Sequence, residues 1–167
     1  MTFQDDGREA ARQAALDALA IDRIEDTAVN DLARMAADLC GTPVALVSLV
    51  DGDKQWFKAR VGLDAAETPR EWAFCAHAIL DPDKVLVVED ALQDPRFAGN
   101  PLVTQEPHIR FYAGAPLVSS SGQALGTVCV IDRKPRKLDP ERLESLRFLA
   151  RQVVTRLEEA QKKRSGG

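Results

Sequence analysis

The N-terminal third of the chain changes from helical to strand spacing of its apolar positions. Residues 8–20 are rich in Ala, Arg and Leu and predict a first helix. Asp26 or Thr27 can cap a second helix, which Gly41 ends because glycine tolerates the positive φ of a helix C-terminus. The following segment, 44–50, is apolar and rich in β-branched residues, so it predicts a central strand.

Two hairpins account for most of the predicted sheet. The dipeptide Asp51-Gly52 is a hairpin turn signal, and residues 54–61 after it alternate roughly between polar and apolar. Residues 109–118 and 123–131 are two further strands joined by a short polar turn. Strands connected this tightly must be antiparallel.

The remaining segments predict short elements, one long loop and a closing helix. Residues 71–80 are typical of a short helix and residues 85–88 of a short strand. Residues 89–108 have little periodicity and predict a long ordered loop, a kind of segment that is usually functional. The last helix, capped by Asp139, covers residues 140–163. Together the elements predict an α+β fold, with an antiparallel sheet and helices packed on one face.

The closing helix carries a seam of apolar residues that alternate by three and four positions. Such a seam either packs inside the chain, against the first helix, or forms a homodimer through the terminal helices, and the sequence favours the homodimer. The seam residues are Leu143, Leu146, Ala150, Val153, Leu157 and Ala160.

Composition and charge narrow the class of protein. A length of 167 residues fits one domain with one core, and a net charge of −4 argues against nucleic-acid binding. No apolar run is long enough to cross a membrane, and the acidic N-terminus does not resemble a signal peptide. Three widely spaced cysteines are typical of free thiols in a reducing compartment. We therefore expect a cytoplasmic protein.

An ordered set of short strings resembles the GAF domains of bacterial sensor kinases and cyclic-di-GMP enzymes. The resemblance covers about residues 15–160 and implies a six-stranded antiparallel sheet with helices on one face. It also implies a ligand pocket on the other face, roofed by residues 62–80 and 89–108. The strings are ALVSLVD (45–51), QWFK (55–58), VGL (61–63), FCAHAI (74–79), DPRF (94–97), NP (100–101), IRFYAGAPL (109–117) and LGTVCVID (125–132).

The chain leaves no room for the output module that normally accompanies such a domain. It is either a stand-alone sensor or a piece of something longer; Met1 and a complete first helix favour the stand-alone sensor. We treat residues 1–167 as a single domain, with the terminal helices as dimerisation or signalling elements.

The middle of the chain gathers aromatic and polar residues that are suited to a ligand pocket. Aromatic residues make up only 5% of the sequence, so their concentration there is informative. The predicted pocket residues are Trp56, Phe57, Trp72, Phe74, Cys75, His77, Asp94, Phe97, Arg110 and Tyr112.

Several chemistries remain open for this pocket. Arg110 either grips a carboxylate or phosphate in the cavity or pairs with an internal acid such as Asp94. Cys75 and His77 are two residues apart, which on a helix does not pair a nucleophile with its base. Two histidines in distant segments do not make a metal site.

Within the GAF resemblance, two ligand classes are not supported by the sequence. A bilin-attaching cysteine often stands directly before a histidine, whereas Ala76 intervenes here, so no covalent bilin is expected. The ordered signature of cyclic-nucleotide-binding members is absent as well. We therefore leave the ligand unidentified.

Three functions follow from these observations. The leading one is a sensory domain that binds a small effector and signals through its terminal helices or a partner protein. The second is a ligandless module for dimerisation or protein interaction. Separately, the short basic stretch 132–137 is either a solvated loop or a docking patch for an acidic partner surface. The third is a cysteine redox enzyme related to free methionine-(R)-sulfoxide reductase. It is disfavoured because no cysteine lies in residues 95–108, where the resemblance places the nucleophile.

Overall fold

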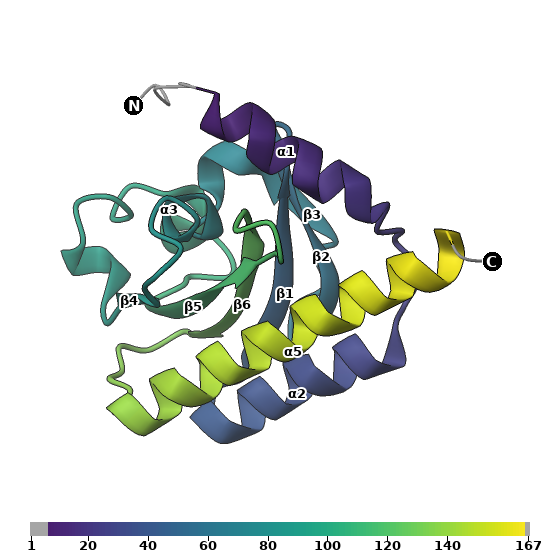
Figure 1. The fold of residues 1–167 in the computed structure, drawn as a ribbon. Helices are drawn as coiled ribbons and strands as arrows, with labels where there is room; N and C mark the ends of the chain where they lie inside the picture. The colour runs from purple at the N-terminus through teal and green to yellow at the C-terminus, as the bar shows by residue number, and fades with distance from the viewer. Residues whose placement is uncertain (1–6, 166–167) are drawn as a thin grey trace.

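The centre of the structure, a computed structural model that describes residues 7–165, is one antiparallel sheet. Its strands are β1 (Val44–Asp51), β2 (Lys54–Val61), β3 (Glu67–Pro69), β4 (Leu86–Val88), β5 (Phe111–Val118) and β6 (Ala124–Asp132). They are ordered β3-β2-β1-β6-β5-β4 (Figure 1). The predicted α+β fold with a six-stranded antiparallel sheet is confirmed. The predicted domain also includes residues 1–6 and 166–167, which lie outside the described residues.

Three long helices cover one face of the sheet: α1 (Arg8–Leu19), α2 (Thr27–Cys40) and α5 (Pro140–Ser165) (Figure 1). The Asp26 carboxylate caps α2 by accepting hydrogen bonds from the backbone N–H groups of Ala28 and Val29. Gly41 ends α2 in the left-handed conformation with a φ of 66°. Both predicted ends of α2 are therefore confirmed.

The other face is covered by short elements and the loops between them. They are η1 (Arg70–Trp72), α3 (Cys75–Ala78), η2 (Ala91–Gln93) and α4 (Pro101–Thr104). The helix predicted over residues 71–80 is interrupted at Ala73, whose backbone is extended. The predicted loop 89–108 is ordered, and it contains η2 and α4. The sequence pattern did not locate β3, because three residues are too few to show an alternation.

Separate hydrophobic cores lie on the two faces, and a small third cluster includes Cys75 and Ile79. The helix-side core joins one face of β1, β5 and β6 to aliphatic residues of the three long helices. The loop-side core is smaller and includes Phe74, Phe97 and Tyr112. Because both faces are covered, β1 and β6 are buried along almost their whole length, which explains their continuous apolar sequences.

The apolar seam of α5 belongs to the helix-side core. Leu146, Ala150, Val153 and Leu157 are buried there within the single chain, while Leu143 and Ala160 are partly buried. The prediction that these four buried residues form a dimer interface is therefore wrong. They pack mainly against β5 and α2 rather than the first helix, because α5 lies directly on the sheet beside α2.

Candidate functional site

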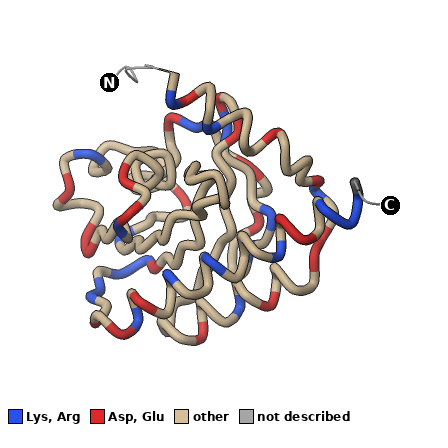
Figure 2. The backbone as a smooth tube through the Cα atoms, viewed as in Figure 1, with Lys and Arg blue, Asp and Glu red and all other residues tan. Residues whose placement is uncertain are grey.

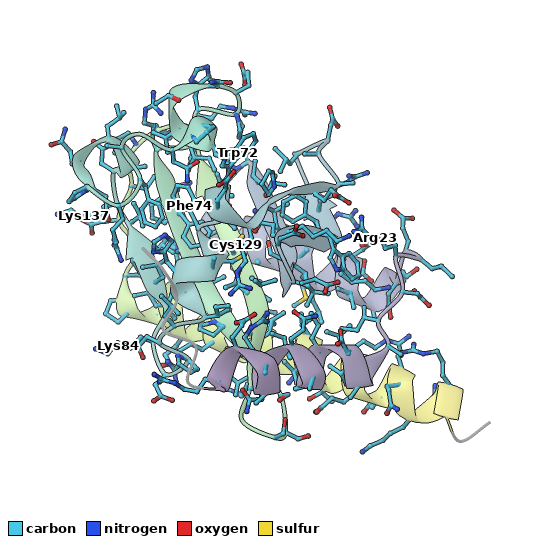
Figure 3. All side chains as sticks on the ribbon, turned by 90° about the horizontal axis from the view of Figure 1, so that it is seen from above. Arg23, Trp72, Phe74, Lys84, Cys129 and Lys137 are labelled. Atoms are coloured by element: carbon cyan, nitrogen blue, oxygen red, sulfur yellow. The ribbon has the colours of Figure 1, made fainter. Side chains whose placement is uncertain are left out.

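A cavity of about 460 Å³ lies between the loop-side face of the sheet and the segments that cover it. Trp72 and Phe74 lie on the side of the sheet away from α1 and α5, with Cys129 on the sheet beneath them (Figure 3). Most of the lining is apolar. The lining residues are Val44, Leu46, Ser48, Gln55, Phe57, Gly62, Leu63, Asp64, Ala65, Glu67, Thr68, Pro69, Trp72, Phe74, Leu102, Glu106, Pro107, Ile109, Tyr112, Cys129, Ile131 and Arg133.

The Tyr112 side chain lies flat along β5 and forms part of the cavity floor. Its hydroxyl is 3.2 Å from the Thr127 hydroxyl, and its ring lies over Gly114 two residues further on. A Cβ atom at Gly114 would be 2.7 Å from Cζ of the Tyr112 ring, which is too close for any real contact. The absence of a side chain at Gly114 is thus what allows the tyrosine to lie down. Burial raises the pKa of the Tyr112 phenol well above its usual value.

A chain of buried hydrogen bonds supports the wall next to the floor. The Cys75 thiol donates to Oε1 of Gln55 at 2.7 Å, and the Gln55 amide nitrogen donates to the Thr68 hydroxyl at 2.7 Å. The Ser48 hydroxyl is 4.0 Å from the Cys129 sulfur. Burial raises the pKa of the Cys75 thiol, and it raises that of the Cys129 thiol to about 11, so both are protonated at neutral pH.

Charged side chains occur only at the mouth of the cavity among its lining residues, and two of them are already engaged. Glu67 pairs with Arg23 at 2.8 Å, and Arg133 donates from Nε to the backbone carbonyl of Pro107 at 3.1 Å. Glu106 is largely exposed, with a relative side-chain accessibility of 83%. The mouth therefore carries three carboxylates and one arginine.

The predicted basic stretch, 132–137, includes this arginine and is visible between β6 and the start of α5 (Figure 2). Within it, Arg136 pairs with Asp132 at 3.0 Å and also donates to the backbone carbonyl of Gly41. Part of the stretch thus fastens the end of β6 to the end of α2. A docking role for it stays a prediction.

Four of the predicted pocket residues line the cavity: Phe57, Trp72, Phe74 and Tyr112. Trp56 does not, so its prediction as a pocket residue is wrong. It pairs with Leu49 in the β1–β2 register and is buried with it on the helix side of the sheet. There its indole Nε1 donates to Asp51 at 3.2 Å. The sequence placed both aromatics in one pocket, although neighbouring strand residues face opposite sides.

Arg110 and Asp94 fit neither alternative offered for them. The Arg110 guanidinium donates to the backbone carbonyls of Val103 in α4 and of Ile109, at 2.9 and 3.0 Å, and so fastens α4 and the segment after it. Asp94 pairs instead with Arg96, at 2.7 Å. Arg110 precedes β5, and neither Arg110 nor Asp94 lines the cavity. The prediction that they are pocket residues is therefore wrong.

Phe97, His77 and Cys75 form a second layer behind the cavity wall. The Phe97 ring stacks on Phe74 with centroids 4.1 Å apart, and the His77 ring meets Phe97 edge-on at 4.9 Å. Burial, followed by the charge of Arg96, lowers the pKa of His77. None of these three predicted residues lines the cavity. Phe97 and His77 support Phe74, whereas Cys75 donates to Gln55, so Cys75 and His77 have different partners.

The sequence analysis missed most of the polar lining. Ser48 interrupts the apolar run of β1, and Gln55 stands two residues before Phe57 on the same strand face. Both signals were present: a polar residue in a buried strand, and the period of two along β2. Within residues 7–165 no group of three His, Cys, Asp or Glu side chains could hold a metal ion. In the same residues no helix is long and apolar enough to cross a membrane.

The wall of the cavity is connected to the N-terminal helix through η1. Trp72 ends η1, and Arg70 begins it with two hydrogen bonds to the Glu9 carboxylate of α1, at 2.8 and 3.1 Å. Burial alone would raise the pKa of Glu9, but the hydrogen bonds from Arg70 and Arg12 lower it to about 2. At the other end of α1, Arg164 of α5 donates to the backbone carbonyl of Leu19 at 2.7 Å.

Known proteins are similar to this chain in sequence and in fold. A cyclic di-GMP phosphodiesterase of Pseudomonas aeruginosa is 46% identical over 151 residues, which are 89% of this chain and 26% of that protein. The chain thus spans about a quarter of the length of this relative.

The fold matches solved structures of low sequence identity. The GAF domain of a Coxiella burnetii phosphoenolpyruvate-protein phosphotransferase superposes with a TM-score of 0.68 at 12% identity, covering 98% of this chain and 99% of that one. A free methionine-R-sulfoxide reductase of Neisseria meningitidis superposes with a TM-score of 0.65 at 18% identity, covering 98% and 97%. The GAF domain pattern matches residues 25–157. The chain therefore belongs to the GAF domain family.

Proposed function

We propose that this chain is a sensory GAF domain that binds a small-molecule effector in the cavity between the sheet and η1, α4 and the adjoining loops. The observation that carries this proposal is the cavity itself, which has about 460 Å³ of space and four aromatic side chains in its lining. A mostly apolar cavity of that size with a few polar groups is typical of small-molecule sites. The 46% identical cyclic di-GMP phosphodiesterase supports a signalling role.

Ligand occupancy would reach the rest of the molecule through η1. A ligand that contacts Trp72 biases the position of η1, and η1 holds α1 through the Arg70–Glu9 pair. The opposite end of α1 is held by Arg164, so α1 and the C-terminal end of α5 respond together. A ligand shifts this assembly only as far as it binds one arrangement better than the other.

Regulation of cyclic di-GMP turnover is the signalling context that the 46% identical phosphodiesterase suggests. This chain corresponds to about a quarter of that relative, so we propose a regulatory role rather than the phosphodiesterase activity. A thiolate-based redox activity is less well supported, because the Cys75 thiol is buried and donates to Gln55.

Native mass spectrometry of the protein as purified tests the cavity site. We expect a bound species of extra mass in the wild type and its loss in Leu102→Trp, because Leu102 is a partly buried cavity residue on α4. Leu92→Trp is the matched control: Leu92 is on the neighbouring η2, 46% exposed, and outside the cavity lining. Extra mass that survives Leu102→Trp would place the ligand elsewhere.

A ligandless dimerisation module is the second candidate, and one surface patch favours it. Met35 and Leu39 of α2 and Phe148 of α5 are exposed at 48%, 46% and 52%, and they line one shallow groove. Glu144 and Arg151 lie one turn before and after Phe148 on the same groove. An antiparallel, two-fold pairing about Phe148 would bring Glu144 of one chain to Arg151 of a second copy.

The oligomeric state of Phe148→Glu tests this alternative. The substitution places a like charge at the centre of the patch, so a dimer of the wild type should dissociate in sedimentation velocity. Leu92→Glu, on an exposed apolar residue outside the patch, should leave the oligomeric state unchanged. A wild type that is monomeric at all concentrations would remove the alternative.

A further inference from the structure

The proposed function leaves the chemical class of the effector open, and the inner wall of the cavity restricts it. Every polar side chain that lines the cavity inside its mouth is uncharged: Ser48, Gln55, Thr68, Tyr112 and Cys129. The phenol and the thiol among them are held in their neutral forms by burial. A charged group that entered this space would lose its hydration and gain no opposite charge, which is costly.

The charges of the lining lie at the mouth and disfavour anions. Three of them, Asp64, Glu67 and Glu106, are acidic. The one lining cation, Arg133, is exposed and already donates from Nε to the carbonyl of Pro107. Phosphate and carboxylate ligands are normally held by arginine or lysine side chains in bidentate or multiple contacts. Arg133 is a single cation whose Nε is engaged, and the three carboxylates at the mouth outnumber it and repel an approaching anion.

The uncharged polar groups retain hydrogen-bonding capacity toward the cavity. The Gln55 amide nitrogen carries two hydrogens and donates one of them to Thr68. The contact of the Ser48 hydroxyl with the Cys129 sulfur, at 4.0 Å, is at the outer limit for a hydrogen bond to sulfur, although Ser48 is fully buried. Both side chains have partners within the protein, and the second Gln55 amide hydrogen and the long Ser48 contact leave them able to hydrogen-bond to a ligand group as well.

The aromatic side chains define the remainder of the ligand. Phe57 and Trp72 are only partly buried and line the cavity together with Phe74 and Tyr112. Ring faces contact flat apolar surfaces well without any charge. We infer that the cavity binds an uncharged molecule with a flat or compact apolar body and a polar group for Gln55 and Ser48, and that it excludes phosphorylated and carboxylated ligands. This inference rests on the proposed function of the cavity.

Two fluorescent probes that differ by one charged group test the inference. N-phenyl-1-naphthylamine is neutral, and 8-anilino-1-naphthalenesulfonate carries the same ring system with a sulfonate. We expect the neutral probe to bind the purified protein saturably and at least about tenfold more tightly than the sulfonate, because the sulfonate must be desolvated without a cationic partner. The Leu102→Trp variant should lose the binding and Leu92→Trp should retain it, with circular dichroism confirming that both fold.

A charge added to the wall sharpens the test. Leu102→Lys places an ammonium group at the cavity and should shift the preference toward the sulfonate, whereas Leu92→Lys should not. Equal or tighter sulfonate binding by the wild type, lost in Leu102→Trp, would overturn the neutral class while the cavity site stands. If Leu102→Trp left the binding of both probes unchanged, the cavity site and the inference would be overturned together.

Discussion

The two faces of the sheet differ in their residues and in the length of the elements that cover them. The helix side is covered by three long helices, and its core consists mostly of aliphatic residues. The loop side is covered by short elements of three or four residues, with aromatic, thiol and hydroxyl side chains beneath them. Long amphipathic helices can close-pack over a sheet, whereas short irregular elements bridge it and leave space. We therefore expect the first face to contribute more to stability, and the proposed ligand site lies on the second.

A core truncation on the helix side should have the largest effect on stability. Leu146 of α5 is fully buried there, so Leu146→Ala removes packed methyl groups and leaves a void. We expect a loss of about 2–5 kcal/mol in the free energy of unfolding, measured by urea denaturation. Probe binding by the remaining folded protein should be unchanged. A smaller loss of stability than in the loop-side variants would contradict the expectation that the helix side contributes more to stability.

A substitution at the cavity floor should have the next largest effect, and it should change both stability and probe binding. Gly114→Ala puts a Cβ against the Tyr112 ring, which must leave its position along β5. We expect about 1–3 kcal/mol of destabilisation from this overpacking, together with weaker binding of the neutral probe as the ring enters the cavity. Gly99→Ala is the control, since a Cβ there meets no atom within 4 Å. Unaltered binding in a destabilised Gly114→Ala would show that Tyr112 moves away from the cavity.

Truncation of a side chain in the cavity wall should lower stability less than the two preceding substitutions and weaken probe binding more. Phe57 is partly buried and faces the cavity, so Phe57→Ala gives up less packing than a core substitution. We expect a decrease of about 1–2 kcal/mol in the free energy of unfolding and a clear loss of affinity for the neutral probe in a fluorescence titration. Trp56→Phe on the opposite face should leave the affinity intact, which tests the corrected position of that residue.

Removing the Glu9–Arg70 pair, which links α1 to η1, should lower the free energy of unfolding slightly and in a way that depends on pH. The pKa of Glu9 is lowered to about 2 in the folded protein from an ordinary value of 4.5, so its contribution is complete above about pH 4.5 and is lost as the pH falls toward 2. Glu9→Gln should therefore destabilise the protein at pH 7, by about 1 kcal/mol, and the difference from wild type should shrink toward pH 3. Urea denaturation at both pH values measures it. A difference independent of pH would mean that the Glu9 charge contributes nothing.

Much of the fold could be predicted because local signals agreed with the final structure. Asp26 and Gly41 bounded α2, and the apolar segments gave five of the six strands close to their observed ends. The pocket was predicted less well. Phe57, Trp72, Phe74 and Tyr112 line it, but Trp56, Asp94 and Arg110 do not. The failures concern side chains whose direction depends on the strand face or on loop contacts, as the Arg110 bonds to backbone carbonyls show.

The sequence by itself determined the sheet, the long helices and the family, because hydrophobic periodicity, caps and turn residues act over short stretches of chain. Only the tertiary structure decided which side of α5 is buried and where the cavity lies. The seam of α5 could face a sheet or a second chain with the same spacing, and contact with β5 and α2 settled the choice for Leu146 and Val153. The uncharged lining of the cavity joins Ser48, Gln55 and Cys129 from three strands. Their common character emerges only when folding brings those distant residues together.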